Sequence, residues 1–288
     1  MVRSHLTVRL QYVWILLVLT ACVIFGTKKN TNANLFRPKT GVQSNNNVMT
    51  GSIMPRATVT GASKNHASTL LSFLQNYREN NGEGIPLVVY DLGLSSATRT
   101  LIQQQHPWVQ VRWFDFSRYP KFFDIDVAQG EYAWKPVIVK EMLETTAAMV
   151  LWLDSGDKLA NPTALSDVFY KLSLNGYFTT ETSGTMADWV HPKMLEFFDY
   201  HDGQKPMCNG AIVGFDKDSS NTYETVVLPW VRCALNQACI SPKGSSRANH
   251  RQDQSALTVL LHMTGRHCAF KAEIALHTDV DELSAEKW

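Results

Sequence analysis

The sequence lacks the motifs that identify several common classes of enzyme. No G-x-G-x-x-G follows its first predicted strand and no G-x-x-x-x-G-K-[ST] occurs anywhere, which argues against a dinucleotide-binding fold and a P-loop. No H-E-x-x-H or nucleophile-elbow motif supports a hydrolase. Charge of one sign is not in excess either. With a net charge of +1, nothing indicates a nucleic-acid-binding protein.

Cysteine is scarce, and its spacing excludes a common metal site. The chain has five cysteines and no C-x-x-C, so we predict no zinc site. Cys22 lies in an apolar run, and the other four lie in the last third of the chain: Cys208, Cys233, Cys239 and Cys268. Four cysteines in one domain suit two disulfides in an oxidising compartment, with three possible pairings. The alternative is four buried free thiols.

One long hydrophobic run is present, near the amino terminus. Leu10–Gly26 has a single strongly polar member, Gln11, and lies at the short end for a membrane span. Arg3 and Arg9 precede it, as in a signal peptide, but more apolar residues follow the only small-residue cleavage candidate. We therefore predict an uncleaved transmembrane anchor. No N-x-[ST] sequon with a permissible middle residue reports on its orientation.

A polar segment separates this run from the rest of the chain. Residues 27–65 are rich in Asn, Thr, Ser, Lys and Gly without an apolar period, which predicts a flexible stem. We divide the chain into a tail at 1–9, an anchor at 10–26, the stem at 27–65 and a globular domain at 66–288. Lys28 and Lys29 favour a cytosolic domain by the positive-inside rule, whereas the cysteines favour an oxidising compartment.

Strands and helices alternate through the first half of the predicted domain. Short apolar runs bounded by turn residues predict strands at 87–90, 109–116 and 149–153, with helices between them. Each of these strands ends in an acid or in a turn that contains one. This order is typical of a parallel α/β sheet that binds a ligand at the carboxyl edge of its strands.

The third strand ends in the sequence Asp154-Ser155-Gly156-Asp157. Two acids at the end of a strand, with a glycine that lets the backbone approach closely, suit a divalent cation and a diphosphate. The alternative is an ordinary Asp/Gly turn after a buried strand.

Three blocks of sequence then occur in a recognisable order: Leu151-Trp152-Leu153-Asp154, Cys208-Asn209-Gly210-Ala211 and Asp253-Gln254-Ser255-Ala256-Leu257. Together they resemble the nucleotide-diphospho-sugar transferase (GT-A) superfamily. The pattern is similar to glycosyltransferase family 8, with its Leu-Tyr-Leu-Asp-Ala-Asp, Asn-[Ser/Ala]-Gly and Asp-Gln-Asp blocks. Trp134-Lys135-Pro136, taken with the first block, also resembles a poorly characterised eukaryotic family of that superfamily. The resemblance covers about Leu87 to His277.

The resemblance implies a fold, a reaction and a location. The fold is a single α/β domain of the GT-A type, Rossmann-like and three-layered, with a mixed, mainly parallel central sheet. The reaction is transfer of a hexose-like sugar from a nucleotide diphosphate, expected to be a UDP-sugar, to a hydroxyl of a glycan, protein or lipid. Many members are single-pass type II membrane proteins, which implies a catalytic domain in the lumen of the Golgi or the endoplasmic reticulum.

The resemblance also implies roles for particular residues. Asp154 matches the first Asp of the metal-binding motif, so Mn²⁺ or Mg²⁺ is expected as a cofactor. The second Asp of the motif falls on Gly156, and Asp157 is predicted to replace it. His277 matches a late metal ligand. We predict Asp154 and the Asp-Gln pair as catalytic residues (Asp253, Gln254). We predict the donor-binding residues at strand ends, at a helix start and in the second block (Asp91, Asp115, Lys135, Asn209, Gly210).

Three other interpretations remain open at this stage. The domain could have lost catalysis and bind only a glycan or a protein partner, because Gly156 departs from the metal motif. It could be a hydrolase that uses Asp154 and Asp157 with a metal, or a membrane-tethered structural protein. The donor sugar, the acceptor and the linkage do not follow from the sequence.

Overall fold

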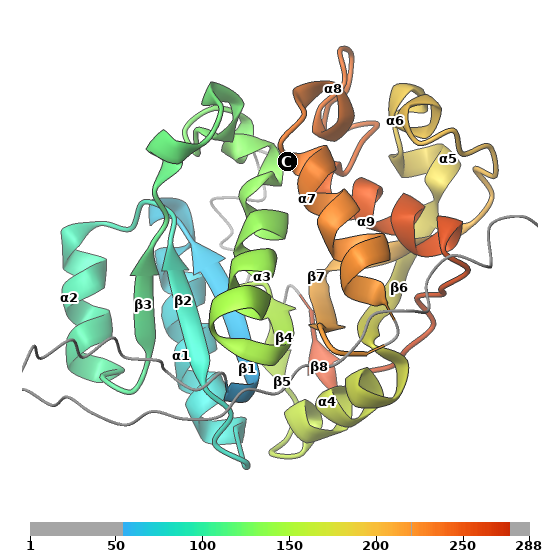
Figure 1. Ribbon diagram of the computed structural model, residues 1–288. Coiled ribbons are helices and arrows are strands. Elements are labelled where there is room, and N and C mark those ends of the chain that lie inside the picture. The colour runs from blue at the N-terminus through green and yellow to red at the C-terminus, as the bar shows by residue number, and fades with distance from the viewer. Residues whose placement is uncertain (1–53, 220, 277–288) are drawn as a thin grey trace, which may run out of the picture. The chain divides into compact units, whose positions relative to one another are not determined.

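The computed structural model describes residues 54–219 and 221–276, which lie within one compact unit, Gly51–Trp288 (Figure 1). Its main sheet has six strands in the order β3-β2-β1-β4-β7-β6. The strands are β1 (Met54–Ala62), β2 (Leu87–Asp91), β3 (Gln110–Trp113), β4 (Ala147–Leu153), β6 (Tyr177–Thr185) and β7 (Pro206–Asp216). The first four are parallel, whereas β7 runs antiparallel to both β4 and β6. The predicted mixed, mainly parallel sheet is therefore confirmed.

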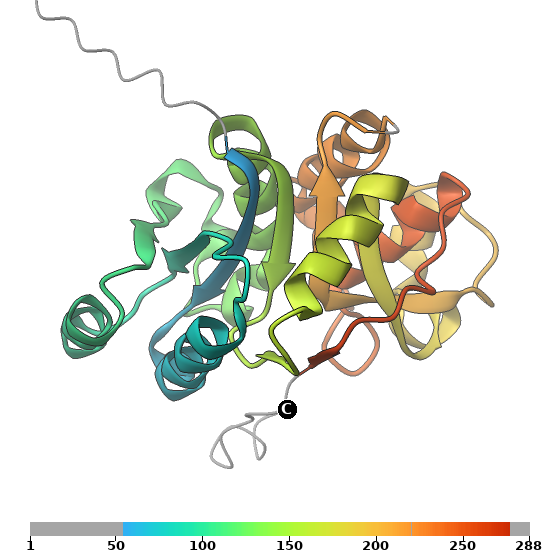
Figure 2. The same cartoon turned by 90° about the horizontal axis from the view of Figure 1, so that it is seen from below.

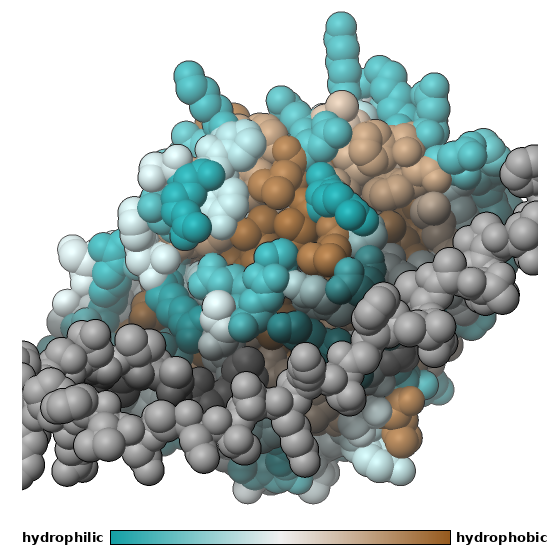
Figure 3. Space-filling model, in the orientation of Figure 1, coloured by the Kyte–Doolittle hydropathy of each residue, from teal (hydrophilic) through white to brown (hydrophobic). Residues whose placement is uncertain are grey.

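Helices cover both faces of this sheet (Figure 2). One apolar cluster packs the sheet against α1 (Ala67–Asn80), α2 (Ser96–Gln105) and α4 (Ala164–Asn175). The other packs it against α3 (Trp134–Thr145), α7 (Leu228–Ala234) and α9 (Gln252–Met263). Apolar side chains gather over α3 and α7 on the face seen in Figure 3, with polar side chains around them. The predicted three-layer arrangement is confirmed.

Shorter elements connect the layers. They comprise α5 (Met186–Trp189), α6 (Pro192–Phe197), α8 (Gln237–Ile240) and a small antiparallel pair, β5 (Lys158–Leu159) and β8 (Ile274–Ala275). Short 3₁₀ turns form at Lys64–His66, Phe116–Arg118 and Lys121–Phe123, a left-handed turn forms at Ala128–Tyr132, and a π-helical turn forms at Tyr223–Val227. None of the helices in the described ranges is both long and apolar enough to cross a membrane. The predicted anchor at 10–26 lies outside those ranges.

Strand β4 is buried on both faces, as its apolar sequence predicts. Val150 and Trp152 point into the cluster beneath α3, whereas Leu151 and Leu153 point into the cluster beneath α1 and α4. Successive side chains of a strand point to opposite faces, so a strand covered on both sides needs apolar residues at every position. This burial holds the end of β4, and Asp154 with it, in a fixed place.

The predicted boundary between stem and domain is wrong. Residues 54–62, assigned to the stem, form β1, which lies between β2 and β4 near the middle of the sheet. This strand reads Pro-Arg-Ala-Thr-Val-Thr-Gly-Ala after Met54 and has few large apolar residues, so it does not show the apolar run of a buried strand. Its small side chains and threonines are nevertheless buried (Ala57, Thr58, Val59, Thr60).

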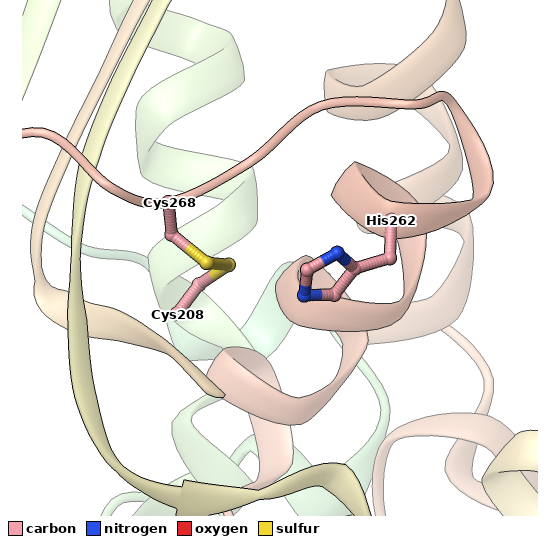
Figure 4. A group of neighbouring side chains, drawn as sticks. All are labelled: Cys208, His262 and Cys268. Atoms are coloured by element: carbon pink, nitrogen blue, oxygen red, sulfur yellow. A yellow bond between two sulfur atoms is a disulfide. The ribbon is translucent and has the colours of Figure 1, made fainter. Parts of the chain in front are cut away.

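Both disulfides of the domain are formed. Cys208 on β7 pairs with Cys268 after α9, and Cys233 pairs with Cys239 between α7 and α8. Figure 4 shows His262 beside the first disulfide, and these three side chains are the only possible metal-binding group found among the described residues. Sulfurs joined in a disulfide are not thiolates and do not bind metal as such. We therefore interpret this group as structural.

Candidate functional site

A pocket of about 610 Å³ opens where β1, β2 and β4 end. This is the carboxyl edge at which open α/β sheets bind ligands. Its walls come from the ends of β1 and β4, the turn before α3, the middle of β7 and the start of α9. The lining includes Gly61, Ser63, His66, Gln129, Tyr132, Lys135, Asp154, Gly156, Gly210, Arg247, Arg251, Asp253 and Gln254. The three sequence blocks that lie far apart in the chain thus meet in one place.

A buried lysine links these blocks. Lys135 is in the first turn of α3, and its Nζ donates to Asp154 Oδ1 at 3.0 Å and to the carbonyl oxygen of Gly210 at 2.9 Å. Asp253 Oδ2 lies 3.4 Å from the same nitrogen. The side chain of Lys135 is 5% exposed, and Nζ lies 5.1 Å from the centre of the Trp152 ring. One ammonium therefore joins α3, β4, β7 and α9.

The charges in this cluster stabilise one another. Burial by itself lowers the pKa of Lys135, but the carboxylates of Asp154 and Asp253 outweigh it and raise that pKa above its ordinary value. Burial raises the pKa of Asp253, and Lys135 opposes the rise. The lysine is therefore charged, and it is the cation that allows Asp253 to be buried at the start of α9.

Asp154 is the carboxylate of the cluster that reaches the open pocket. Its side chain is 29% exposed, against 6% for Asp253. Oδ1 also accepts a hydrogen bond of 2.6 Å from Trp152 Nε1, and the backbone N–H of Asp154 donates to the carbonyl of Ala211. These contacts fix the direction of the side chain. Asp154, predicted as a catalytic residue and a metal ligand, therefore lines the pocket.

Asp157 does not lie where a second metal ligand is needed. It is fully buried and absent from the pocket lining, and its Oδ2 accepts from the backbone N–H of Asp154 at 3.1 Å. Its role in the structure is to hold the turn after β4. The placement therefore does not support the prediction that Asp157 replaces the missing Asp at Gly156. His277, the third predicted ligand, lies outside the described residues.

The second block brings the middle of β7 against the start of α9. A Cβ atom on Gly210 would lie 3.0 Å from Cβ of Gln254, so a glycine permits this approach. Gly210, predicted to bind the donor, and Gln254, predicted as catalytic, both line the pocket. Asn209 does not. Its Oδ1 accepts from the N–H of Ala211 at 2.8 Å, so this side chain shapes the strand instead of facing the pocket.

Two predicted donor-binding acids are placed elsewhere. Asp91 accepts from the N–H groups of Gly93 and Leu94 and pairs with Arg99, which shapes the turn after β2. Asp115 accepts from the N–H and the hydroxyl of Ser117. Neither lines the main pocket, so we correct both predictions. An acid at a strand end often satisfies its own turn, and local sequence does not separate that role from ligand binding.

Two arginines supply positive charge to the pocket. The guanidinium carbon of Arg251 lies 3.9 Å from the centre of the Trp189 ring, and Nη1 donates to the carbonyl of Arg247 at 2.7 Å. The guanidinium carbon of Arg247 lies 5.2 Å from the centre of the Tyr132 ring. The Asp-Gln block did not identify Arg247 as a pocket residue, because the loop before α9 has no motif of its own.

The wall beside Lys135 is a left-handed turn. Residues Ala128–Tyr132 all have φ between 47° and 62°, which only glycine adopts without strain. Gly130 is required there, because a Cβ at this position would lie 2.3 Å from the carbonyl oxygen of Phe123. The turn brings Gln129 and Tyr132 into the pocket lining. Propensity gives no indication of such a turn, and we did not predict it.

The end of β1 also lines the pocket, through Gly61, Ala62 and the turn that follows as far as His66. Sequence reasoning missed residues 61–65 because it assigned them to the stem. The only signal for them is the pair Gly61-Ala62, followed by Ser63 before an amphipathic helix.

A divalent cation, which the resemblance implies, does not fit the described residues of this pocket. The carboxylates of Asp154 and Asp253 already share the ammonium of Lys135. Gly156 brings no ligand, and Asp157 is buried in the turn. Metal sites of the Mn²⁺ and Mg²⁺ type need several oxygen ligands directed at one point.

Comparison with known proteins gives the following likenesses. The family described as "protein of unknown function (DUF1647)" matches residues 44–140. A search of curated proteins finds no match.

Three similar solved structures are glycosyltransferases. The bifunctional enzyme WbbM is 15% identical, with a TM-score of 0.48 over 78% of this chain, which spans 40% of that protein. The galactosyltransferase LgtC, in complex with donor and acceptor sugar analogues, is 14% identical, with a TM-score of 0.45 over 74% of this chain and 72% of that one. The mannosyltransferase from Pyrobaculum calidifontis, with GDP-Man and Mn²⁺, is 13% identical, with a TM-score of 0.44 over 80% and 59%.

Proposed function

We propose that this protein is a glycosyltransferase that moves a sugar from a nucleotide diphosphate, with a UDP-sugar as the first candidate, to a hydroxyl group of a glycan, protein or lipid. One observation carries this proposal. The three blocks that resemble GT-A enzymes converge on one pocket at the carboxyl edge of the sheet, where Lys135 joins Asp154, Gly210 and Asp253. A pocket of about 610 Å³ has room for a small nucleotide-linked ligand.

The reaction needs two kinds of group in the pocket. The bond between the anomeric carbon and the diphosphate oxygen breaks, and its electron pair stays on the diphosphate. The acceptor oxygen forms a bond to the anomeric carbon, and the hydroxyl proton is released. Cations stabilise the departing diphosphate, and carboxylates position hydroxyl groups of the sugar and the acceptor.

The exposure of each side chain to the pocket indicates which of these tasks it can perform. Asp154 reaches the pocket, and its proposed task is to accept hydrogen bonds from sugar hydroxyls. Gln254, also in the lining, offers both a donor and an acceptor. Asp253 is 6% exposed and acts by holding Lys135 in place. Arg247 and Arg251 supply the positive charge that a diphosphate requires.

We also propose the cellular arrangement that the resemblance implies. The segment 10–26 anchors a single-pass type II protein, and the domain lies in the lumen of the Golgi or the endoplasmic reticulum. Two disulfides support an oxidising compartment, because such bonds are rare in the cytosol. Protease protection of the domain in intact microsomes tests this proposal, and cleavage without detergent contradicts it.

The test of the reaction is release of nucleoside diphosphate. The full-length protein is incubated with UDP- and GDP-sugars and a panel of hydroxyl acceptors, with and without Mn²⁺. We expect release from one donor class that falls about a hundredfold or more in Asp154→Asn, since a neutral amide cannot replace a catalytic carboxylate. Asp115→Asn is the matched control, because Asp115 caps a turn outside the pocket.

Other outcomes of this experiment would support one of the alternative functions or contradict the proposed site. Nucleotide binding without turnover of any donor supports a domain that only binds its ligand. Release of phosphate from simple phosphate esters, but not of nucleoside diphosphate from sugar donors, supports the hydrolase. Equal activity of Asp154→Asn and wild type contradicts the proposed site.

A further inference from the structure

We propose that this site binds the donor diphosphate through its own arginines, Arg251 and Arg247, and needs no divalent cation, because Lys135 already occupies the cation position between Asp154 and Asp253. The inference rests on the proposed function, since it concerns how the same pocket holds a nucleoside diphosphate. It departs from what the resemblance implies, namely a cofactor of Mn²⁺ or Mg²⁺.

The first step concerns the lysine. Its Nζ donates hydrogen bonds to Asp154 Oδ1 at 3.0 Å and to the Gly210 carbonyl at 2.9 Å, and it forms an ion pair with Asp253 Oδ2 at 3.4 Å. These contacts direct the ammonium toward oxygens of the protein. The lysine therefore serves the protein and not the phosphate. A divalent cation at Asp154 would lie close to this fixed positive charge and would be repelled by it.

The second step concerns the missing ligands. Asp154 Oδ1 also receives the indole N–H of Trp152 at 2.6 Å, which draws that oxygen further into the protein. The position of the second acid in the metal motif is Gly156. The next acid, Asp157, is fully buried and accepts from the N–H of Asp154. One partly exposed carboxylate therefore remains at the end of β4.

The third step concerns the arginines. Arg251 is stacked on Trp189 at 3.9 Å and is anchored by its hydrogen bond to the Arg247 carbonyl. No carboxylate among the described residues forms an ion pair with it. A stacked guanidinium presents its remaining N–H groups in a plane, which suits two phosphate oxygens at once. Arg247, over Tyr132, brings a second charge.

The balance of charge supports the same conclusion. Lys135, Asp154 and Asp253 together carry one negative charge, which leaves the two arginines as the cations of this wall. The diphosphate of a nucleotide sugar carries two negative charges, one on each phosphate, and the two arginines match them in number without a metal ion. The pocket thereby places its arginines on the loop before α9 and the carboxylate of Asp154 at the end of β4.

The test measures binding rather than turnover. UDP and GDP are titrated into the full-length protein by calorimetry, once in EDTA and once in MnCl₂. We expect one of them to bind in EDTA with a dissociation constant within about threefold of that in Mn²⁺. We expect Arg251→Gln to weaken this binding about tenfold or more, because a charge-assisted hydrogen bond is lost. Arg232→Gln, an exposed arginine on α7 outside the pocket, is the matched control.

Two results overturn the inference, and they are distinguishable. If the nucleotide binds only in Mn²⁺, or more than about threefold tighter there, the inference fails and the proposed function stands. Unchanged binding by Arg251→Gln also contradicts the role of the arginine. If neither nucleotide binds a folded sample in either buffer, the proposed function itself fails.

Discussion

Lys135 is the residue on which the site depends most. It is buried in the first turn of α3, and its ammonium meets carboxylates from the end of β4 and the start of α9. Removing one partner of a buried ionic group leaves charge without compensation, which costs far more than losing a pair on the surface. The site and the stability of the domain therefore share this residue.

Lys135→Met is expected to lower the free energy of unfolding by about 3–5 kcal/mol at pH 7, because two carboxylates then face each other without a cation. The loss should be smaller at pH 5, since like charges raise the pKa of one carboxyl and let it bind a proton in the folded state. Chemical denaturation at both pH values measures the difference.

Lys140→Met on the same helix is the control for this prediction. Its ion pair with Glu144 is partly exposed, at 31% and 38% for the two side chains. Such pairs contribute less than about 1 kcal/mol. An equal effect of the two substitutions would contradict the central role of Lys135.

His250 links the loop before α9, which carries Arg247 and Arg251, to the segments packed beside it. The residue is fully buried, its Nδ1 accepts from the N–H of His191, and its Nε2 lies 3.0 Å from the carbonyl oxygen of Ile240. This arrangement requires the neutral ring. Burial lowers the pKa of His250 to about 4, and the hydrogen bond to Ile240 opposes this only in part.

The pH dependence follows from that shift. The unfolded chain binds a proton on this histidine near pH 6.5, whereas the folded chain does so only near pH 4. Stability from the neutral ring is therefore complete above about pH 6.5 and falls as the pH approaches 4, by roughly 3 kcal/mol in total. His250→Gln cannot titrate, so its stability should fall less over this range in denaturation experiments. Parallel curves for the two proteins would contradict the shift.

At the scale of elements, the left-handed turn Ala128–Tyr132 is the least expected. Left-handed conformation costs about 1–2 kcal/mol for each residue other than glycine. The turn is held by the bonds from Gly130 N to Val127 O at 2.8 Å and from Trp134 Nε1 to Gln129 O at 3.0 Å. Gln252 Nε2 reaches Glu131 at 3.2 Å and ties the turn to α9. Contacts distant in sequence thus stabilise a conformation that the local sequence disfavours.

Gly130→Ala should lower the unfolding free energy by about 3 kcal/mol or more, because a Cβ would add a clash with the Phe123 carbonyl to the strain of a positive φ. Gly84→Ala separates the two effects. Gly84 has a φ of 63°, close to the 62° of Gly130, but open space around its Cβ position. It should cost about 1 kcal/mol. Similar thermal shifts for both variants would show that the clash relaxes freely.

At the scale of the whole molecule, the fold depends on β1, a strand that the sequence pattern does not predict. β1 separates β2 from β4, so its loss would divide the parallel part of the sheet. A chain that lacks residues 1–50 should keep the domain, whose compact unit begins at Gly51. A chain that lacks residues 1–65 should be insoluble or unfolded. Circular dichroism and gel filtration compare the two, and equal folding would contradict the position of β1.

Much of the fold follows from local pattern. The apolar run before Asp154 predicts a strand buried on both faces, and the alternation of strands and helices predicts a parallel α/β sheet. Both features depend on neighbours in the sequence, whose periodicity reflects the faces that they bury. This pattern does not predict β1, because its buried positions are occupied largely by threonine and alanine instead of large apolar residues.

The candidate site was likewise predictable from the sequence only in part. Asp154, Lys135, Gly210, Asp253 and Gln254 were all recognised from motifs, since each lies in a block with its own order of residues. That Asp91, Asp115 and Asp157 satisfy their own turns follows only from the hydrogen bonds in the folded chain. The pairing of the cysteines, the left-handed turn and the place of Lys135 between two carboxylates likewise come from tertiary contacts. Burial and charge pairing join residues more than a hundred positions apart, and no local pattern records them.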